Sequence, residues 1–229
     1  MLIPTNPSSI PPTHPRPPQA SVGTVIFDFD GTIADSLAAG IKIGNQLAEE
    51  FGLEPITMDK LRRWQNLSSQ QILKEAKIPF FRIPRLLSRF RVEMNREVPQ
   101  LSPIPGIQEA LLALKQNGYR LGIVSSNSEN NVWAFLHARQ LDHLFDFVVS
   151  SPRVLGKNKV LKRLIKEYQL HPDHVFYIGD ETRDVEAAHK TGVKSIAVCW
   201  GFNSPHALRS HNPDFLLRDP QELVSLLCP

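Results

Sequence analysis

The sequence predicts an α/β protein in which a Rossmann-like parallel sheet carries an inserted helical cap domain. Two observations predict this class. From Val22 onward, short β-branched runs alternate with helix-length stretches, which is typical of βαβ units joined by right-handed crossovers. One long interval after the first run interrupts this alternation, because it has helical patterning and no convincing strand.

The expected elements follow from this alternation. Five continuous apolar runs are expected to be buried strands, at residues 22–27, 120–125, 145–150, 174–179 and 195–200. Four stretches between them are expected to be helices, at residues 106–117, 129–139, 157–169 and 184–191, two of which end at a glycine. Ligands of open α/β sheets bind beyond the carboxyl ends of the strands, so we expect the functional site at that edge.

The chain divides into three parts. Residues 1–20 contain seven of the 19 prolines and no acidic residue, so we expect a disordered tail that lacks the unbroken apolar segment of a secretory signal. Residues 21–35 and 104–229 are expected to form the core. Residues 36–103 are expected to form the helical insertion, on two apolar patterns: Leu37, Ile41, Leu47, Ala48 and Phe51, then Leu86, Leu87, Phe90 and Met94 after Pro84.

Charge and composition exclude several classes of protein. The net charge is only +3, which does not indicate a nucleic-acid-binding protein unless the basic residues are concentrated in a patch. Residues 60–100 hold ten Lys or Arg and three Glu, so the insertion is expected to attract an anion. No apolar run approaches the ~18 residues of a membrane span. Cys199 and Cys228 form no zinc or disulfide pattern, so a reducing cytoplasm is expected.

Two carboxylates follow the first expected strand. In the stretch DFDGTIADS, Asp28 and Asp30 stand two residues apart where the strand runs into the turn at Gly31. Like charges at a strand end repel unless a cation holds them, so this pair indicates a metal site. Asp35 and Ser36, which come next, are better explained as helix caps.

Polar residues also follow three later strands. Ser125, Ser126 and Asn127 precede a helix, where hydroxyls and free amides can receive phosphate oxygens. Lys157 and Lys159 follow the third strand, where a lysine can neutralise a carboxylate and a phosphate together. After the fourth strand, GDETRD places three acids in five residues: Asp180, Glu181 and Asp184. Such hard oxygen ligands suit Mg²⁺.

From these motifs and their order, the sequence resembles the haloacid dehalogenase superfamily of phosphohydrolases, over Val22 to about Leu227. DFDGTIADS and GDETRD carry the resemblance, and the insertion lies where that superfamily has its C1 cap. Together with the stretch Trp200-Gly201-Phe202, they make the chain most similar to phosphoglycolate-phosphatase-like members.

The resemblance implies roles for the residues of the first two motifs. Asp28 would be the nucleophile that forms an aspartyl-phosphate, and Asp30 the general acid and base, whose backbone carbonyl also binds Mg²⁺. Thr32 resembles the family's turn-organising threonine and is expected next to the substrate. Ser126 and Asn127 would bind the phosphate, with Ser125 as the alternative register.

The resemblance extends to the later motifs. Lys157, or Lys159 as the alternative, would be the stabilising lysine, and Asp180 and Asp184 would join Asp28 and Asp30 as metal ligands, with Glu181 in support. Dehalogenases of this superfamily lack an acid at Asp30, so the pair favours phosphate ester cleavage. The resemblance thus implies a Mg²⁺-dependent phosphatase for a small phosphorylated metabolite, with 2-phosphoglycolate first among the candidates.

Three alternatives stay open. A phosphosugar mutase of the β-phosphoglucomutase type would share the cap and the motifs. Phosphonate cleavage would need a cap lysine for a Schiff base, which Lys60, Lys74 or Lys77 would have to supply. A catalytically silent binding module would use the basic insertion, whose aromatic residues could stack bases, to dock a partner. The intact set of acids argues against this last alternative. The sequence does not indicate an oligomeric state.

Overall fold

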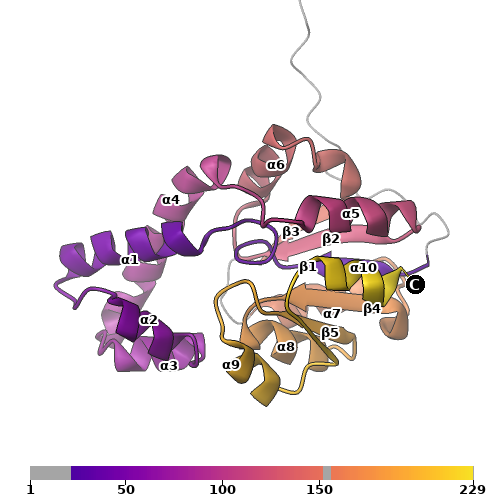
Figure 1. Cartoon of the computed structure of the whole chain (residues 1–229). Helices are drawn as coiled ribbons and strands as arrows, with labels where there is room; N and C mark the ends of the chain where they lie inside the picture. Colours follow the sequence, from indigo (N-terminus) through magenta and orange to yellow (C-terminus); the bar gives the residue numbers. More distant parts are fainter. Residues whose placement is uncertain (1–21, 152–155, 229) are drawn as a thin grey trace, which may run out of the picture.

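The computed structural model describes residues 22–151 and 156–228, so the expected tail at 1–20 lies outside the described residues. In the described chain, six parallel strands form one sheet in the order β3-β2-β1-β4-β5-β6 (Figure 1). The strands are β1 (Thr24–Phe27), β2 (Arg120–Ser125), β3 (Phe147–Ser150), β4 (Val175–Gly179), β5 (Lys194–Val198) and β6 (Phe215–Leu217). The predicted Rossmann-like fold class is therefore confirmed.

Helices cover both faces of the sheet because the central strands are apolar on both sides. Val25 and Phe27 point into a core shared with α5 (Ile107–Gln116), α6 (Glu129–Ala138) and α10 (Gln221–Leu227). Ile26 points into the opposite core, which contains apolar residues of α7 (Lys157–Glu167) and α8 (Thr182–His189). The short α9 (Pro205–Ser210) packs on α8. Figure 1 shows α5 and α10 above the sheet and α7 and α8 below it.

Of the five α-helices between β1 and β2 in the sequence, the first four lie beside the sheet in space (Figure 1). They are α1 (Leu37–Phe51), α2 (Met58–Trp64), α3 (Ser69–Glu75) and α4 (Ile83–Glu97). α1 and α4 pack through a small core of their own that includes Ile43, Leu47 and Met94. The two chain segments that join these helices to the sheet run side by side, because the Asp35 N–H donates to the Ser102 carbonyl at 2.9 Å.

Short 3₁₀ turns complete the described chain: η1 (Phe80–Arg82), η2 (Val98–Gln100), η3 (Asp142–Leu144) and η4 (Pro172–His174). The structure departs from the expected elements at several ends. α8 begins at Thr182, two residues before the expected start, because the side chain of Glu181 caps it and Asp184 completes the capping box. β6, α9 and α10 were not expected. No described helix is both long and apolar enough to cross a membrane.

Candidate active site

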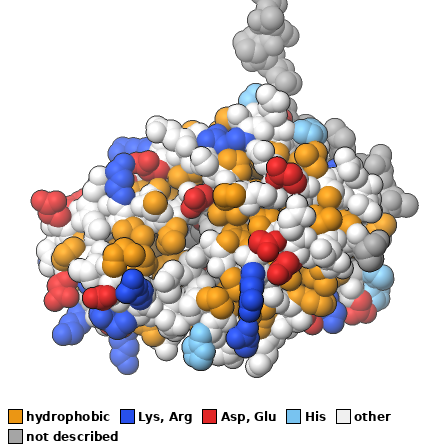
Figure 2. All heavy atoms as spheres, in the orientation of Figure 1, with side chains coloured by type: hydrophobic (Ala, Val, Ile, Leu, Met, Phe, Trp, Pro, Cys, Tyr) orange, Lys and Arg blue, Asp and Glu red, His pale blue; other side chains and the backbone are white. Residues whose placement is uncertain are grey.

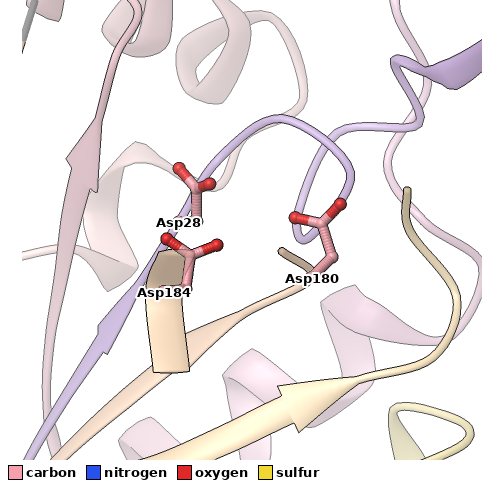
Figure 3. A group of neighbouring side chains, drawn as sticks. All are labelled: Asp28, Asp180 and Asp184. Carbon is pink, nitrogen blue, oxygen red and sulfur yellow. The ribbon is translucent and has the colours of Figure 1, made fainter. Parts of the chain in front are cut away.

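Three carboxylates meet beyond the carboxyl ends of the central strands. Asp28 follows β1, Asp180 follows β4, and Asp184 lies in the first turn of α8. One oxygen atom from each lies within 4.8 Å of the others, and all three residues are buried. Figure 3 shows Asp28 and Asp184 close together, and Asp180 beneath the turn that follows β1. β1 and β4 are neighbours in the sheet, so parallel pairing brings the two acid motifs to one edge.

A buried lysine holds two of these carboxylates. The Lys157 Nζ lies 2.5 Å from Asp28 Oδ2 and 2.7 Å from Asp184 Oδ1. The Tyr177 hydroxyl also donates to Asp184 Oδ1, at 3.2 Å. Burial by itself would lower the pKa of Lys157, but Asp184 and Asp28 outweigh it and raise that pKa, so the lysine stays protonated. Lys159 lies exposed on the same helix, so the structure brings Lys157 to the carboxylates and leaves Lys159 outside.

The cluster carries more negative charge than Lys157 offsets. Burial raises the pKa of Asp28 to about 7, since the opposing effect of Lys157 is partly cancelled by Asp184. Burial and the neighbouring Glu181 raise the pKa of Asp180 well above its usual range. Three buried carboxylates with this deficit of positive charge, and with oxygen as the only donor atom, fit a hard divalent cation such as Mg²⁺.

Two positions next to Asp180, residues 31 and 201, have room only for glycine. A Cβ on Gly31 would lie 2.4 Å from Asp180 Oδ2, and Gly31 has a φ of +74°. A Cβ on Gly201 would lie 2.3 Å from the same oxygen. The Phe202 N–H donates to that oxygen at 2.7 Å, and the Thr32 hydroxyl donates to Asp180 Oδ1 at 3.0 Å. Asp180 is therefore fixed by the turn after β1 and the loop after β5 together.

Thr32 itself is fully buried behind Asp180 and does not line the cavity described below. Its carbonyl accepts a hydrogen bond from the indole N–H of Trp200 at 3.1 Å. The Thr32 hydroxyl thus contacts a carboxylate of the cluster. Ser126 and Asn127, which were also expected at the substrate, line the cavity instead.

Asp30 faces a different environment from Asp28. Its Oδ2 accepts a hydrogen bond from Asn127 Nδ2 at 3.4 Å, and its Oδ1 is shielded without a partner among the described residues. Burial raises the pKa of Asp30, which favours a carboxyl group that can carry a proton. Asp30 is not among the three carboxylates of the cluster.

The end of β2 contributes Ser126 and Asn127 to the cavity, and Ser125 does not reach it. Ser125 is buried, and its hydroxyl accepts the Asn127 N–H at 2.9 Å, which shapes the turn before α6. Ser126 and Asn127 stand at the N-terminal side of that helix, where positive backbone dipoles favour an anion. Of the two registers left open by the sequence, the structure therefore places Ser126 at the cavity.

A cavity of about 390 Å³ lies between this edge of the sheet and the helical insertion. Asp30, Ser126, Asn127, Asp180 and Arg183 form its polar side. Its opposite side is mostly apolar and comes from the insertion, with Leu37, Ile41, Ile56, Leu61, Trp64, Ile72, Phe90 and Met94. Figure 2 shows further hydrophobic side chains on the surface of the insertion. A polar side beside fixed carboxylates and an apolar wall opposite suit a small ligand that is enclosed from water.

Sequence reasoning missed three residues of this site. Arg183 lines the cavity and pairs with Glu181, with Nη2 2.5 Å from Oε1. Tyr177 lies beneath Asp184, and Asn203 accepts the Thr182 N–H at 2.9 Å. Arg183 was visible inside GDETRD, and Asn203 follows a predicted strand at the same sheet edge. Those positions could have indicated Arg183 and Asn203 from the sequence. Tyr177 offers no such signal, because it has the pattern of any buried strand residue.

Comparison with known proteins gives consistent matches. The model of the haloacid dehalogenase-like hydrolase family matches residues 25–198. A phosphoglycolate phosphatase of Synechococcus elongatus is 39% identical over 203 residues, covering 87% of this chain and 94% of that protein. One of Aquifex aeolicus is 28% identical over 207 residues, covering 89% and 95%. A crystal structure of a predicted phosphatase from Clostridium acetobutylicum has a TM-score of 0.78 at 21% identity, covering 91% and 99%, which shows the shared fold.

Proposed function

The chain belongs to the haloacid dehalogenase-like hydrolases and is a phosphatase of that family, and we propose that it hydrolyses 2-phosphoglycolate with the aid of Mg²⁺. The observation that carries the proposal is the placement of two different carboxyl groups. Burial raises the pKa of both groups, but Asp28 lies 2.5 Å from the protonated Lys157, which favours its charged form, whereas Asp30, two residues later, lines the cavity beside the neutral amide of Asn127. One is suited to be a nucleophile and the other to carry a proton.

In the proposed reaction, a carboxylate oxygen of Asp28 attacks phosphorus, and the bond from phosphorus to the alcohol oxygen breaks. Asp30 gives its proton to that alcohol oxygen. Asp30 then takes a proton from a water molecule that attacks the aspartyl-phosphate, and inorganic phosphate leaves while the Asp28 carboxylate is restored. Ser126 and Asn127 would hold the phosphate oxygens in line with Asp28.

Lys157 and the metal ligands serve the charge balance of this reaction. Lys157 stays protonated between Asp28 and Asp184, so it would neutralise the nucleophile. Asp28, Asp180 and Asp184, with the Asp30 carbonyl, would hold Mg²⁺, which supplies positive charge to the transferred phosphoryl group. Thr32 would keep Asp180 in place through the hydrogen bond it donates.

The substrate proposal draws support from the relatives and from the cavity. Relatives from Synechococcus elongatus, Haemophilus influenzae and Aquifex aeolicus are named phosphoglycolate phosphatases. The cavity is small, at about 390 Å³, and both Arg91 and Arg183 line it. The Arg183 Nε is shielded without a hydrogen-bond partner among the described residues. A guanidinium in that position suits the carboxylate of a two-carbon leaving group.

The proposal is tested by measuring phosphate release from a panel of esters, with and without Mg²⁺. The panel contains 2-phosphoglycolate, a sugar phosphate, a nucleotide, and 2-hydroxyethyl phosphate, which matches 2-phosphoglycolate in size but lacks its carboxylate. Asp28→Asn is the blank. We expect Mg²⁺-dependent release that the blank lacks, with 2-phosphoglycolate preferred over 2-hydroxyethyl phosphate.

Two results would contradict this. Equal rates with the two matched esters would remove the substrate assignment while leaving the phosphatase. Undiminished release by Asp28→Asn, with its fold intact by circular dichroism, would remove the mechanism. If no ester releases phosphate, an isomerisation assay with β-glucose 1-phosphate tests the mutase alternative.

A further inference from the structure

Two loops join the insertion to the core at a point away from its covalent linkers. Residues 65–67, the turn between α2 and α3, lie against residues 203–204, the loop after β5. The Asn203 side-chain Nδ2 donates to the Gln65 carbonyl at 2.9 Å and to the Leu67 carbonyl at 3.2 Å. The Ser204 N–H donates to the same Gln65 carbonyl at 2.8 Å. These contacts seat the insertion over the cavity that it lines with Trp64 and Leu61.

The other side of Asn203 reaches the carboxylate loop. Its Oδ1 accepts the N–H of Thr182, the first residue of α8, at 2.9 Å. Its backbone N–H donates to the Asp180 carbonyl at 3.2 Å, and the preceding Phe202 N–H donates to the Asp180 carboxylate. Asn203 is only 2% exposed, so these bonds form away from competing water.

Both polar atoms of the Asn203 side-chain amide have hydrogen-bond partners in this arrangement. It offers two N–H donors and one oxygen, and the donors bind the insertion while the oxygen binds the core. No smaller polar side chain offers two donors to two carbonyls and an acceptor at once. Asp184 lies in the first turn of α8, and Asp180 precedes this helix. The Asn203 side chain therefore contacts both the turn at 65–67 and the segment that carries the two carboxylates.

We propose that Asn203 is a positioning residue that couples the seating of the helical insertion to the placement of Asp180 and Asp184. When the turn at 65–67 lies on residues 203–204, Asn203 is fixed from both sides and holds the first N–H of α8. When the insertion lifts, the two donor bonds break and the loop that carries Asp180 loses one of its supports. The carboxylates are then assembled fully only under a seated insertion. The kinetic consequence of this role rests on the proposed function.

Asn203→Asp and Asn203→Ala separate the two halves of the contact. Asp keeps an acceptor for the Thr182 N–H but sets carboxylate oxygens against the Gln65 and Leu67 carbonyls, so it breaks the contact with the insertion alone. Ala removes both halves. Asn66→Ala is the matched control, because the Asn66 side chain accepts the Ser204 hydroxyl at 2.5 Å and, among the described residues, makes no hydrogen bond with Asn203 or the carboxylate loop.

Amide hydrogen exchange measured by NMR reads each half directly, because the Ser204 N–H donates to the insertion and the Thr182 N–H to Asn203. In Asn203→Asp we expect faster exchange at the Ser204 amide but not at the Thr182 amide. In Asn203→Ala we expect faster exchange at both amides, and in Asn66→Ala no change at Thr182. In ester hydrolysis, Asn203→Asp should mainly raise KM, while Asn203→Ala should also lower kcat, with kcat/KM falling about 10- to 100-fold.

Three results would overturn the proposal. Ser204 could stay as protected in Asn203→Asp as in the native chain, which would show that the bonds to the insertion do not hold it. Both amides, together with the rest of the core, could exchange faster in Asn203→Asp, which would make Asn203 a residue for global stability. Both variants could keep native KM and kcat with a substrate that the protein hydrolyses. The exchange results do not depend on activity, so they decide the contact even where no substrate is found.

Discussion

Lys157 is the side chain that sets the charge balance of the site. It is 3% exposed, and its ammonium group lies within 2.7 Å of both Asp28 and Asp184. The Tyr177 ring lies next to this ammonium group, with its centroid 5.9 Å from Nζ, and the Tyr177 hydroxyl donates to Asp184. Because the Lys157 ammonium group lies between them, the like-charged Asp28 and Asp184 can stay close to each other.

We therefore expect Lys157→Met to be destabilising as well as inactivating. Methionine keeps much of the volume but leaves two buried carboxylates facing each other, and breaking a buried ion pair in this way costs about 3 to 5 kcal/mol. The measurement is urea unfolding in EDTA, combined with an ester hydrolysis assay. Lys159→Met is the control, since Lys159 is exposed on the same helix. Equal free energies of unfolding for the two variants would contradict the role of Lys157.

The sequence predicted the helices and strands that have strong local patterns. The strand at 120–125 has the predicted limits, and both acid motifs lie where strand ends were expected. β6 was missed because it is a three-residue edge strand whose first residue, Phe215, is exposed, so it lacks a buried pattern. The contacts of Asn203 and Tyr177 were missed for another reason. They depend on which loops meet in space, and neither residue type signals this in a single sequence.

β6 illustrates how an edge element is held. Asp214, just before it, accepts the N–H and the hydroxyl of Ser195 in β5, at 2.9 Å and 2.7 Å, and pairs with Lys194 at 3.3 Å. Burial by itself would raise the pKa of Asp214, but these donors lower the pKa below its usual value of 3.8. The ionised carboxylate thus fastens the edge strand to β5.

The sign of this shift predicts a pH dependence of stability. A group whose pKa is lowered by folding stabilises the folded state fully above its unfolded pKa, and the effect is lost as pH falls through the folded pKa. Asp214→Asn should therefore lower the free energy of unfolding by about 1 kcal/mol at pH 7. The difference from the native chain should shrink as pH falls below 3.8.

Urea unfolding at a series of pH values checks this prediction, with Asp173→Asn as the control. Asp173 is exposed, with 74% of its side chain accessible, and its one ion pair among the described residues is with His171 at 3.5 Å. A difference between Asp214→Asn and the native chain that is the same at pH 7 and at pH 3 would show that the charge of Asp214 is not the cause.

Charge is divided between the insertion and the core, which meet at the cavity. Basic side chains gather on the insertion (Figure 2), although Arg89 and Arg96 are paired with Glu50 and Glu93. The core edge opposite holds the buried acids. The pairing within the insertion reduces the positive field that the sequence suggested, whereas the core edge places three buried carboxylates, Asp28, Asp180 and Asp184, around Lys157.

This imbalance predicts that a divalent cation stabilises the entire fold. A cation that binds only the folded protein adds about 2.7 kcal/mol to its stability at 100 times its Kd. For a chain of this size, that raises Tm by roughly 5 to 10 °C. We expect Mg²⁺ to raise the Tm of EDTA-treated protein by such an amount in differential scanning calorimetry, with no substrate present. Asp180→Asn should reduce this increase, because it removes one of the three charges that the cation neutralises. An equal increase with K⁺ at matched ionic strength would indicate general screening instead, and no increase would remove the metal from the proposed mechanism.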